Sequence, residues 1–228
     1  MKLASLLDGV KACIFDMDGT LVDSLGIWSD IDSRFFHERG MEVPADYDKV
    51  ISHMSFKEMA IYTKETYQIK ESVEEIMDMW LEWSKEAYLY TIPAKPGAKE
   101  FLSLLKSKGI PLSLATTNKE ELYLPCLERN GLDGYFDYIE NVNHLRTKKS
   151  EPKIYLTLSE YMHSEPEETL VFEDILMAVN TAKKAAFRVA AVYDERNEKD
   201  LPEIKRNADF FIDDYPSLMN EDILGSKE

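Results

Sequence analysis

The chain has 228 residues, of which 44% are hydrophobic and 11% aromatic, enough apolar material for a sizeable core and too much for a disordered chain. Its 43 acidic residues outnumber 27 basic ones and give a formal net charge of −16, which disfavours nucleic acid and anionic membranes as partners. The two cysteines, Cys13 and Cys126, are too few for a disulfide framework or a zinc site.

The compartment is predicted from two further features. The apolar run at the start of the chain is broken by Asp8, which makes it too short for a secretory signal. No uninterrupted apolar segment approaches the length of a membrane span. We therefore expect a cytoplasmic protein that does not bind membranes.

The first predicted strand, Val10 to Phe15, ends in an unusual way. Asp16 and Asp18 follow it directly, and the chain then turns through Gly19-Thr20. Two like charges at the end of a buried strand cost stability unless a positive group offsets them. The stretch therefore indicates a functional site, and the apolar surroundings of Cys13 favour a core residue over a nucleophile.

Residues 25–91 carry helical patterns and no convincing strand. Ser55-x-x-Glu58 and Ser72-x-x-Glu75 both match the capping box that opens a helix. The second precedes a long helix with apolar residues at helical spacing on one side, Ile76, Met79, Trp80, Trp83 and Ala87. We interpret these aromatics as core residues rather than as a binding surface.

Strands and helices alternate through the rest of the chain. Apolar runs at residues 110–116, 138–139, 169–172, 188–193 and 209–212 are separated by helical patterns. This alternation predicts an α/β fold with a Rossmann-like parallel sheet, and the nearly continuous apolar runs fit strands buried on both faces. We predict a core domain of residues 1–24 and 92–228 and an inserted, all-helical cap domain of residues 25–91.

Four polar groups lie at the expected ends of strands or, for Lys149, ahead of a helix. They are Asp16 and Asp18, the Thr116-Thr117-Asn118 stretch, Lys149, and the pair Glu173-Asp174. Taken singly, each has a simpler explanation, such as a turn, a helix N-cap or a solvated lysine. Ligands of open α/β sheets gather outside the carboxyl ends of the strands, so neighbouring strands would bring all four groups to one crevice.

Together these groups suit phosphate chemistry with a magnesium ion. Mg²⁺ commonly takes one or two carboxylates, here Asp16 and Asp174, together with phosphate and water oxygens. A carboxylate can also attack phosphorus and form an aspartyl-phosphate, while Lys149 offsets charge on the transferring group. Thr116 can donate a hydrogen bond to phosphate, and Asp18 can act as general acid and base.

At these positions the chain resembles the haloacid dehalogenase superfamily of phosphotransferases, in its phosphoglycolate phosphatase and β-phosphoglucomutase branch. "FDMDGTLVDS" is similar to the first motif, D-x-D-G-T, almost letter for letter. "ATTN", "KKSEPKIY" and "VFEDILMAV" resemble the second, third and fourth motifs. The first motif is highly specific and the second is not. The resemblance covers essentially the whole chain and implies a cap domain between the first two motifs.

The resemblance implies a role for each residue. Asp16 would be the nucleophile and a metal ligand, and Asp18 the acid/base, with its backbone carbonyl on Mg²⁺. Lys149, rather than Lys148, matches the family lysine because it lies three residues before Pro152. Asp174 would bind the metal directly, and Glu173 would bind it directly or through water. Thr116, Thr117 and Asn118 would bind the phosphate.

The sequence also departs from the family pattern. Ile175 replaces a small serine, Ala178 and Ala186 stand where glycines are common, and Lys148 stands where a glycine often occurs. These departures affect loop shape but remove no charged group. Trp28 occupies the position where mutases of this branch usually carry a histidine, which disfavours a mutase without excluding it.

Four functional interpretations follow. The leading one is a Mg²⁺-dependent phosphatase acting on a small phosphorylated metabolite, and the alternative enzyme is a phosphomutase of the β-phosphoglucomutase type. A receiver-type signalling domain is disfavoured by the length of the chain and by the helical insertion. A catalytically dead binding protein would be expected to lack one of the charged groups. We expect a monomer. The cap residues that could face the substrate are Trp28, His53, Met54 and Lys57.

Overall fold

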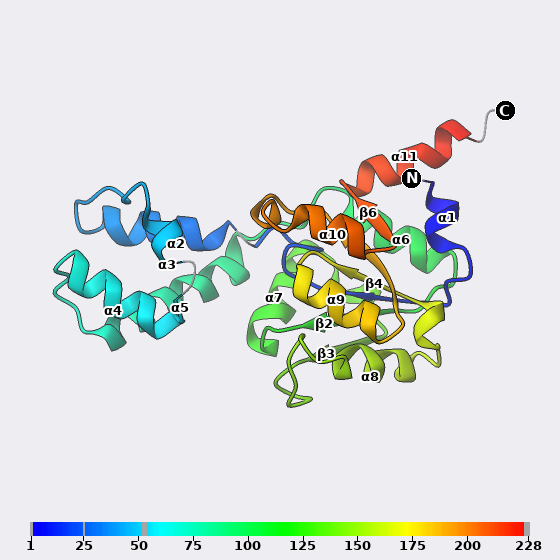
Figure 1. Cartoon of the computed structure of the whole chain (residues 1–228), viewed down its shortest axis with the longest axis horizontal. Coiled ribbons are helices and arrows are strands. Elements are labelled where there is room, and N and C mark those ends of the chain that lie inside the picture. Colours follow the sequence, from blue (N-terminus) through cyan, green and yellow to red (C-terminus); the bar gives the residue numbers. More distant parts are fainter. Residues whose placement is uncertain (1, 25, 52–53, 226–228) are drawn as a thin grey trace. The chain divides into compact units, whose positions relative to one another are not determined.

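The computed structural model describes residues 2–24, 26–51 and 54–225. The chain forms two compact units, residues 1–25 with 92–228 and residues 26–91 (Figure 1). We call them the core unit and the helical unit and describe each by itself. In the described part of the chain, no helix is both long and apolar enough to cross a membrane.

The core unit is built on a six-stranded sheet in which every pair of neighbours is parallel. Its strands are β1 (Ala12–Phe15), β2 (Leu112–Thr116), β3 (Tyr138–Asn141), β4 (Thr169–Glu173), β5 (Arg188–Val192) and β6 (Phe210–Ile212). The order β3-β2-β1-β4-β5-β6 places β1 between β2 and β4. The predicted α/β fold with a parallel sheet is confirmed, and the carboxyl ends of β1, β2 and β4 are neighbours.

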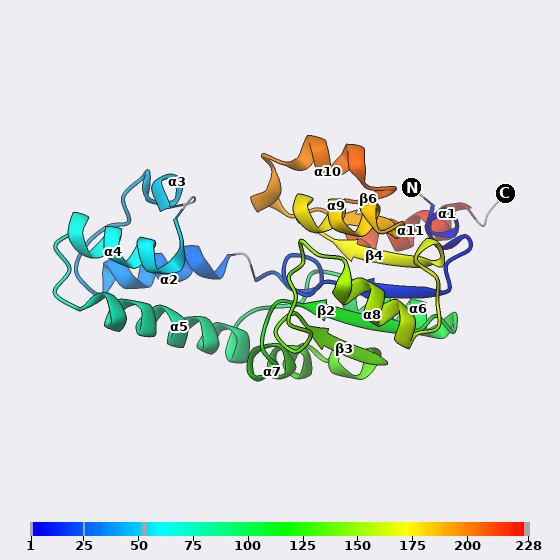
Figure 2. The same cartoon turned by 60° about the horizontal axis from the view of Figure 1, so that its bottom comes forward.

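Helices cover both faces of this sheet. They are α1 (Leu3–Leu7), α6 (Ala98–Ser107), α7 (Glu120–Asn130), α8 (Lys153–Tyr161), α9 (Leu176–Lys184), α10 (Leu201–Asn207) and α11 (Tyr215–Gly225). Successive strand residues point to opposite faces. Ile14 therefore joins a core cluster with Leu158 of α8 and Val179 of α9. These two helices lie in front of the strands in Figure 2. Phe15 instead packs against Phe101 of α6.

The strand boundaries differ slightly from those expected. β1 begins at Ala12 rather than Val10, and β2 begins at Leu112 rather than Ile110. The segments just before them still form hydrogen bonds between neighbouring chain segments, since the Lys11 N–H donates to the Glu168 carbonyl and the Cys13 N–H to the Pro111 carbonyl. Cys13 is fully buried in β1, and burial raises the pKa of its thiol, as suits a core residue.

The helical unit contains α2 (Ile27–His37), α3 (Tyr47–Ile51), α4 (Phe56–Thr66) and α5 (Val73–Tyr90). No strand occurs in its described residues. Both predicted capping boxes are present, at Ser55 with Glu58 before α4 and at Ser72 with Glu75 before α5. Each serine hydroxyl accepts from the glutamate N–H, and each glutamate carboxylate accepts from the serine N–H.

Aromatic packing holds the helical unit together. The Phe35 ring of α2 lies 5.5 Å from that of Trp80 and 6.5 Å from that of Trp83, both on α5. The two tryptophans are buried, as predicted from their spacing. Trp28, in contrast, remains 41% exposed. His53, which we named with Trp28, lies outside the described residues.

Candidate active site

The turn after β1 positions the first pair of aspartates. The Asp16 N–H continues the sheet pattern by donating to the Phe172 carbonyl of β4. The chain then folds back sharply, with Leu21 and Val22 donating to the Met17 carbonyl and Gly19 donating to Val22. Gly19 has a φ of 75°, a left-handed conformation that glycine adopts without steric cost. Asp16 therefore lies at the end of the strand, and Asp18 on the turn.

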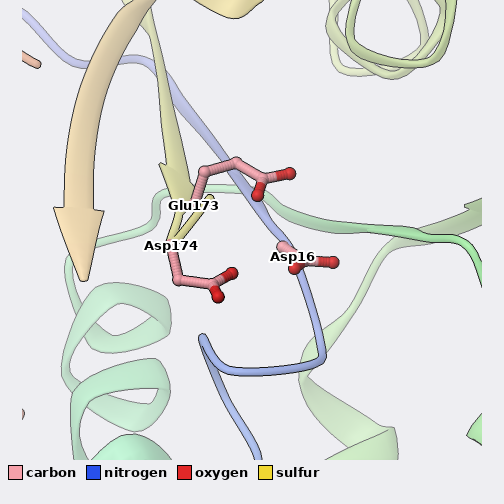
Figure 3. Close-up of side chains that lie close together, drawn as sticks. All are labelled: Asp16, Glu173 and Asp174. Carbon is pink, nitrogen blue, oxygen red and sulfur yellow. The ribbon is translucent and has the colours of Figure 1, made fainter. Parts of the chain in front are cut away.

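Three carboxylates converge where β1 and β4 end. One oxygen each of Asp16, Glu173 and Asp174 lie within 4.8 Å of one another, and all three residues are buried (Figure 3). Glu173 is the last residue of β4 and Asp174 follows it. The neighbouring positions of β1 and β4 in the sheet are what bring these residues together from opposite ends of the chain.

Lys149 provides the positive charge of the cluster. Its ammonium contacts Asp16 and donates to Glu173 Oε1 at 2.7 Å. Burial by itself would lower the pKa of Lys149, but the two carboxylates outweigh burial and raise that pKa above its ordinary value. Lys149 is therefore a fixed cation in the core, whereas the neighbouring Lys148 is exposed.

Glu173 and Asp174 are anchored by hydroxyl and amide donors. The Tyr155 hydroxyl of α8 donates to Glu173 Oε1 at 2.7 Å. The Thr20 hydroxyl donates to Asp174 Oδ1 at 3.3 Å, and the Asn197 amide donates to Asp174 Oδ2 at 2.9 Å. These bonds fix where the two carboxylates point.

The cluster holds more negative than positive charge, and the pKa of two of its carboxyl groups is raised. Burial raises the pKa of Glu173 and that of Asp174, and the charge of Asp16 raises both further. Lys149 opposes this shift but does not cancel it. Three ionised carboxylates carry −3 and Lys149 contributes +1, which leaves −2 in a buried space.

The donor set fits a divalent metal ion. Glu173 Oε2 is buried and has no hydrogen-bond partner among the described residues, so one ligand atom is available there. Buried polar atoms are normally paired, and the formal charge of −2 matches one divalent cation. Because the ligand atoms are carboxylate oxygens, Mg²⁺ suits the site better than a soft metal.

The residues named at the end of β2 have different surroundings from one another. Thr116 is fully buried, and its hydroxyl accepts from the Asn118 N–H at 3.1 Å, which leaves its own hydrogen to donate elsewhere. The Asn118 side-chain amide donates to Asp18 Oδ2 at 2.6 Å. Thr117 is exposed. Both donors of Asn118 therefore bond within the protein, the side-chain amide to Asp18 and the backbone N–H to Thr116.

Comparison with known proteins identifies the family. The family model described as haloacid dehalogenase-like hydrolase matches residues 13–192, which is most of the chain. The chain belongs to this family. The match extends from β1 into β5 and includes every site residue named above except Asn197.

Relatives in this hydrolase family align with most of this chain and with most of their own length. A phosphorylated carbohydrates phosphatase from Thermotoga maritima is 31% identical over 83% of this chain and 88% of its own. A phosphoglycolate phosphatase from Aquifex aeolicus is 30% identical over 79% of this chain and 84% of its own. Both matches therefore extend through core and helical insertion alike.

Solved structures show the same fold. A candidate β-phosphoglucomutase from Thermotoga maritima superposes with a TM-score of 0.82 at 29% identity, covering 96% of this chain and all of the other. A haloacid dehalogenase family hydrolase from Deinococcus radiodurans, solved with phosphate and sodium, has a TM-score of 0.77 at 19% identity, covering 92% and 93%. The α/β fold is therefore that of the family.

Three residues of this candidate site were not given roles from the sequence. Thr20 and Tyr155 lie inside quoted motifs, the threonine of D-x-D-G-T and the tyrosine of "EPKIY", so their positions held a signal. Asn197 stands outside every motif. Its contact with Asp174 depends on how the chain after β5 folds back, which no local pattern encodes.

Proposed function

We propose that the protein is a Mg²⁺-dependent phosphatase that hydrolyses the phosphate monoester of a small metabolite through an aspartyl-phosphate intermediate. The observation that carries the proposal is the buried cluster of Asp16, Glu173 and Asp174 around Lys149. A purely structural site would gain nothing from a net negative charge in the core.

Asp16 is the nucleophile in this proposal. Lys149 contacts one of its carboxylate oxygens, which leaves the other oxygen for attack. That oxygen forms a bond to phosphorus as the bond from phosphorus to the substrate oxygen breaks. Asp18 gives its proton to the departing oxygen, so the substrate leaves as an alcohol.

Water completes the reaction in a second displacement. Asp18, now ionised, takes a proton from water as the water oxygen bonds to phosphorus. The bond between phosphorus and Asp16 breaks, and inorganic phosphate is released. The Asn118 amide donates to Asp18 Oδ2 and so orients this carboxylate.

Phosphate is held by the residues around β2 and by the cations. The Thr116 hydroxyl and the Thr117 backbone N–H donate to phosphoryl oxygens, and the Asn118 N–H supports the Thr116 hydroxyl. Asp16, Asp174 and Glu173, with the Asp18 carbonyl, would hold Mg²⁺. When bound, Mg²⁺ neutralises negative charge on the transferring phosphoryl group.

The substrate is proposed from the relatives. Phosphorylated carbohydrates and phosphoglycolate, which two relatives are named for, are small phosphate esters. Specificity would come from the helical unit, where Trp28, Met54 and Lys57 are accessible at least in part. The acidic surface of the chain gives no support to nucleic acid or membrane partners, and we propose a cytoplasmic monomer.

A phosphomutase is the second candidate. It is favoured by the TM-score of 0.82 with the candidate β-phosphoglucomutase. A mutase would return the phosphoryl group from Asp16 to a second hydroxyl of the substrate and would need a bisphosphate activator. Trp28 cannot supply the proton transfers of a histidine at that position, which makes hydrolysis the better-supported outcome.

The test is phosphate release from a generic aryl phosphate, with Mg²⁺ or with EDTA. We expect turnover that requires Mg²⁺ and is abolished in Asp16→Asn, since the amide oxygen is a poor nucleophile. Asp133→Asn, at an exposed aspartate of the core unit, is the matched control and should behave as wild type. Turnover in EDTA, or in Asp16→Asn, would refute the mechanism. A requirement for added sugar bisphosphate would favour the mutase.

A further inference from the structure

Asn197 makes two hydrogen bonds to a single residue. Its amide Nδ2 donates to Asp174 Oδ2 at 2.9 Å and to the Asp174 backbone carbonyl at 3.1 Å. The amide therefore fixes the Asp174 carboxylate relative to its own backbone. Asp174 is 1% exposed, so water has little access to replace these bonds.

The two oxygens of Asp174 receive different donors. Thr20 donates to Oδ1 and Asn197 donates to Oδ2. Each carboxylate oxygen can accept more than one bond, so each retains a lone pair for a cation. The pair of donors restrains rotation of the carboxylate.

Asn197 is itself held by a capped turn. It ends the short 3₁₀ turn Glu195–Asn197, and its N–H donates to the Asp194 carbonyl at 3.1 Å. The Asp194 side chain caps this turn by accepting from the Arg196 N–H at 3.0 Å. Asp194 is buried, so the turn is anchored from inside the protein.

The second carboxylate oxygen of Asp194 accepts a hydrogen bond from Lys95, which lies just after the helical unit in the chain. Lys95 Nζ donates to Asp194 Oδ2 at 3.0 Å and to the Tyr193 carbonyl at 2.7 Å. The Lys95 N–H donates to the Leu21 carbonyl, in the turn that follows Asp16. An unbroken chain of bonds therefore runs from Lys95 through Asp194 and the turn to Asp174.

We propose that Asn197 is a positioning residue that sets the affinity of Asp174 for the divalent cation, and that Lys95 and Asp194 act through it. The inference rests on the proposed function, because it assumes that Asp174 is a metal ligand. Groups that hydrogen-bond metal ligands typically contribute about 10–100-fold to metal affinity. Asn197 supplies such a bond although it lies outside the segment matched by the family model.

The first test measures Mg²⁺ binding by calorimetry, and Mn²⁺ binding by electron paramagnetic resonance, on the full chain. We expect Asn197→Ala to weaken Mg²⁺ binding about 10–100-fold and to raise the Mg²⁺ concentration needed for half-maximal phosphate release. The KM for the aryl phosphate at saturating Mg²⁺ should change little. Asn207→Ala is the matched control, since that half-buried amide bonds Asn180 instead, and it should bind Mg²⁺ as wild type does.

The second test asks whether Lys95 acts through Asn197. Lys95→Met should weaken Mg²⁺ binding in the same direction but less. The double variant Lys95→Met/Asn197→Ala should then be no weaker than Asn197→Ala alone, since residues in one network are not additive. Unfolding by urea in EDTA verifies that each variant is folded before metal is added.

The outcomes separate this inference from the proposed function. If the wild type binds no divalent cation, the proposed function fails and this inference fails with it. If the wild type binds Mg²⁺ and turns over, but folded Asn197→Ala binds Mg²⁺ equally well, only the role of Asn197 is refuted. Additive losses in the double variant would refute the relay from Lys95.

Discussion

Lys149 supplies the positive charge that offsets the carboxylates of the candidate site. It lies buried between Asp16 and Glu173, and it offsets two carboxylates that would otherwise repel each other. A buried ion pair contributes little net stability, but removing one partner leaves an uncompensated buried charge. The lysine therefore has a structural consequence that can be measured apart from catalysis.

We expect Lys149→Met to lower the free energy of unfolding by about 3–5 kcal/mol in EDTA, because the methionine keeps the volume but not the charge. Mg²⁺ should restore part of this loss, since it neutralises the same carboxylates. Urea denaturation with and without Mg²⁺ measures both effects. Lys148→Met, which changes the exposed neighbour, should leave stability unchanged, and equal stability of both variants would refute the argument.

At the scale of elements, helices α4 and α5 both begin with a capping box. In each, a serine and a glutamate three residues later satisfy two N–H groups that the helix itself cannot. The backbone N–H and the hydroxyl of Ser72 lower the pKa of Glu75, and the Ser55 hydroxyl and N–H lower that of Glu58. Helix initiation in the helical unit is therefore linked to pH.

We expect Ser72→Ala to destabilise the helical unit by about 1 kcal/mol at pH 7, as loss of an N-cap usually does.

The pKa of Glu75 is lowered in the folded state, so the contribution of Glu75 to stability is complete above the ordinary pKa of 4.5. It is lost as pH falls through the folded value. The difference in stability between wild type and Glu75→Gln should therefore vanish in acid. A difference that is independent of pH would contradict this.

At the scale of the whole molecule, the two units can be followed by different probes. All three tryptophans, Trp28, Trp80 and Trp83, belong to the helical unit, whereas the proposed metal ligands all belong to the core unit. Tryptophan fluorescence therefore reports on one unit, and metal binding acts on the other.

We expect Mg²⁺ at about 100 times its dissociation constant to stabilise the core unit by about 2.7 kcal/mol. Thiol labelling of Cys13 and Cys126, which are both buried in the core unit, should show a higher urea midpoint, while the fluorescence midpoint should move little. Equal shifts in both probes would mean that the units unfold as one cooperative system. Repeating the titration with Asp174→Asn, which weakens the proposed site, should remove the shift.

Much of the core could be predicted from local pattern. Apolar runs and helical spacing indicated the parallel sheet, since both depend on residues adjacent in the chain. The capping boxes and the buried faces of Trp80 and Trp83 followed for the same reason. Helices α1 and α11 gave no such signal, and they contact each other only in the folded core unit.

The sequence by itself determined the chemical groups of the site and the strand ends that carry them, because motif spacing and chain alternation are local. Only the tertiary structure decided which atoms meet. The pairing of β1 with β4 brings Asp16 and Asp174 together, the segment between β3 and α8 supplies Lys149, and the fold of the chain after β5 delivers Asn197. Such contacts join residues far apart in sequence, and burial, which gives them their strength, exists only once the chain has packed.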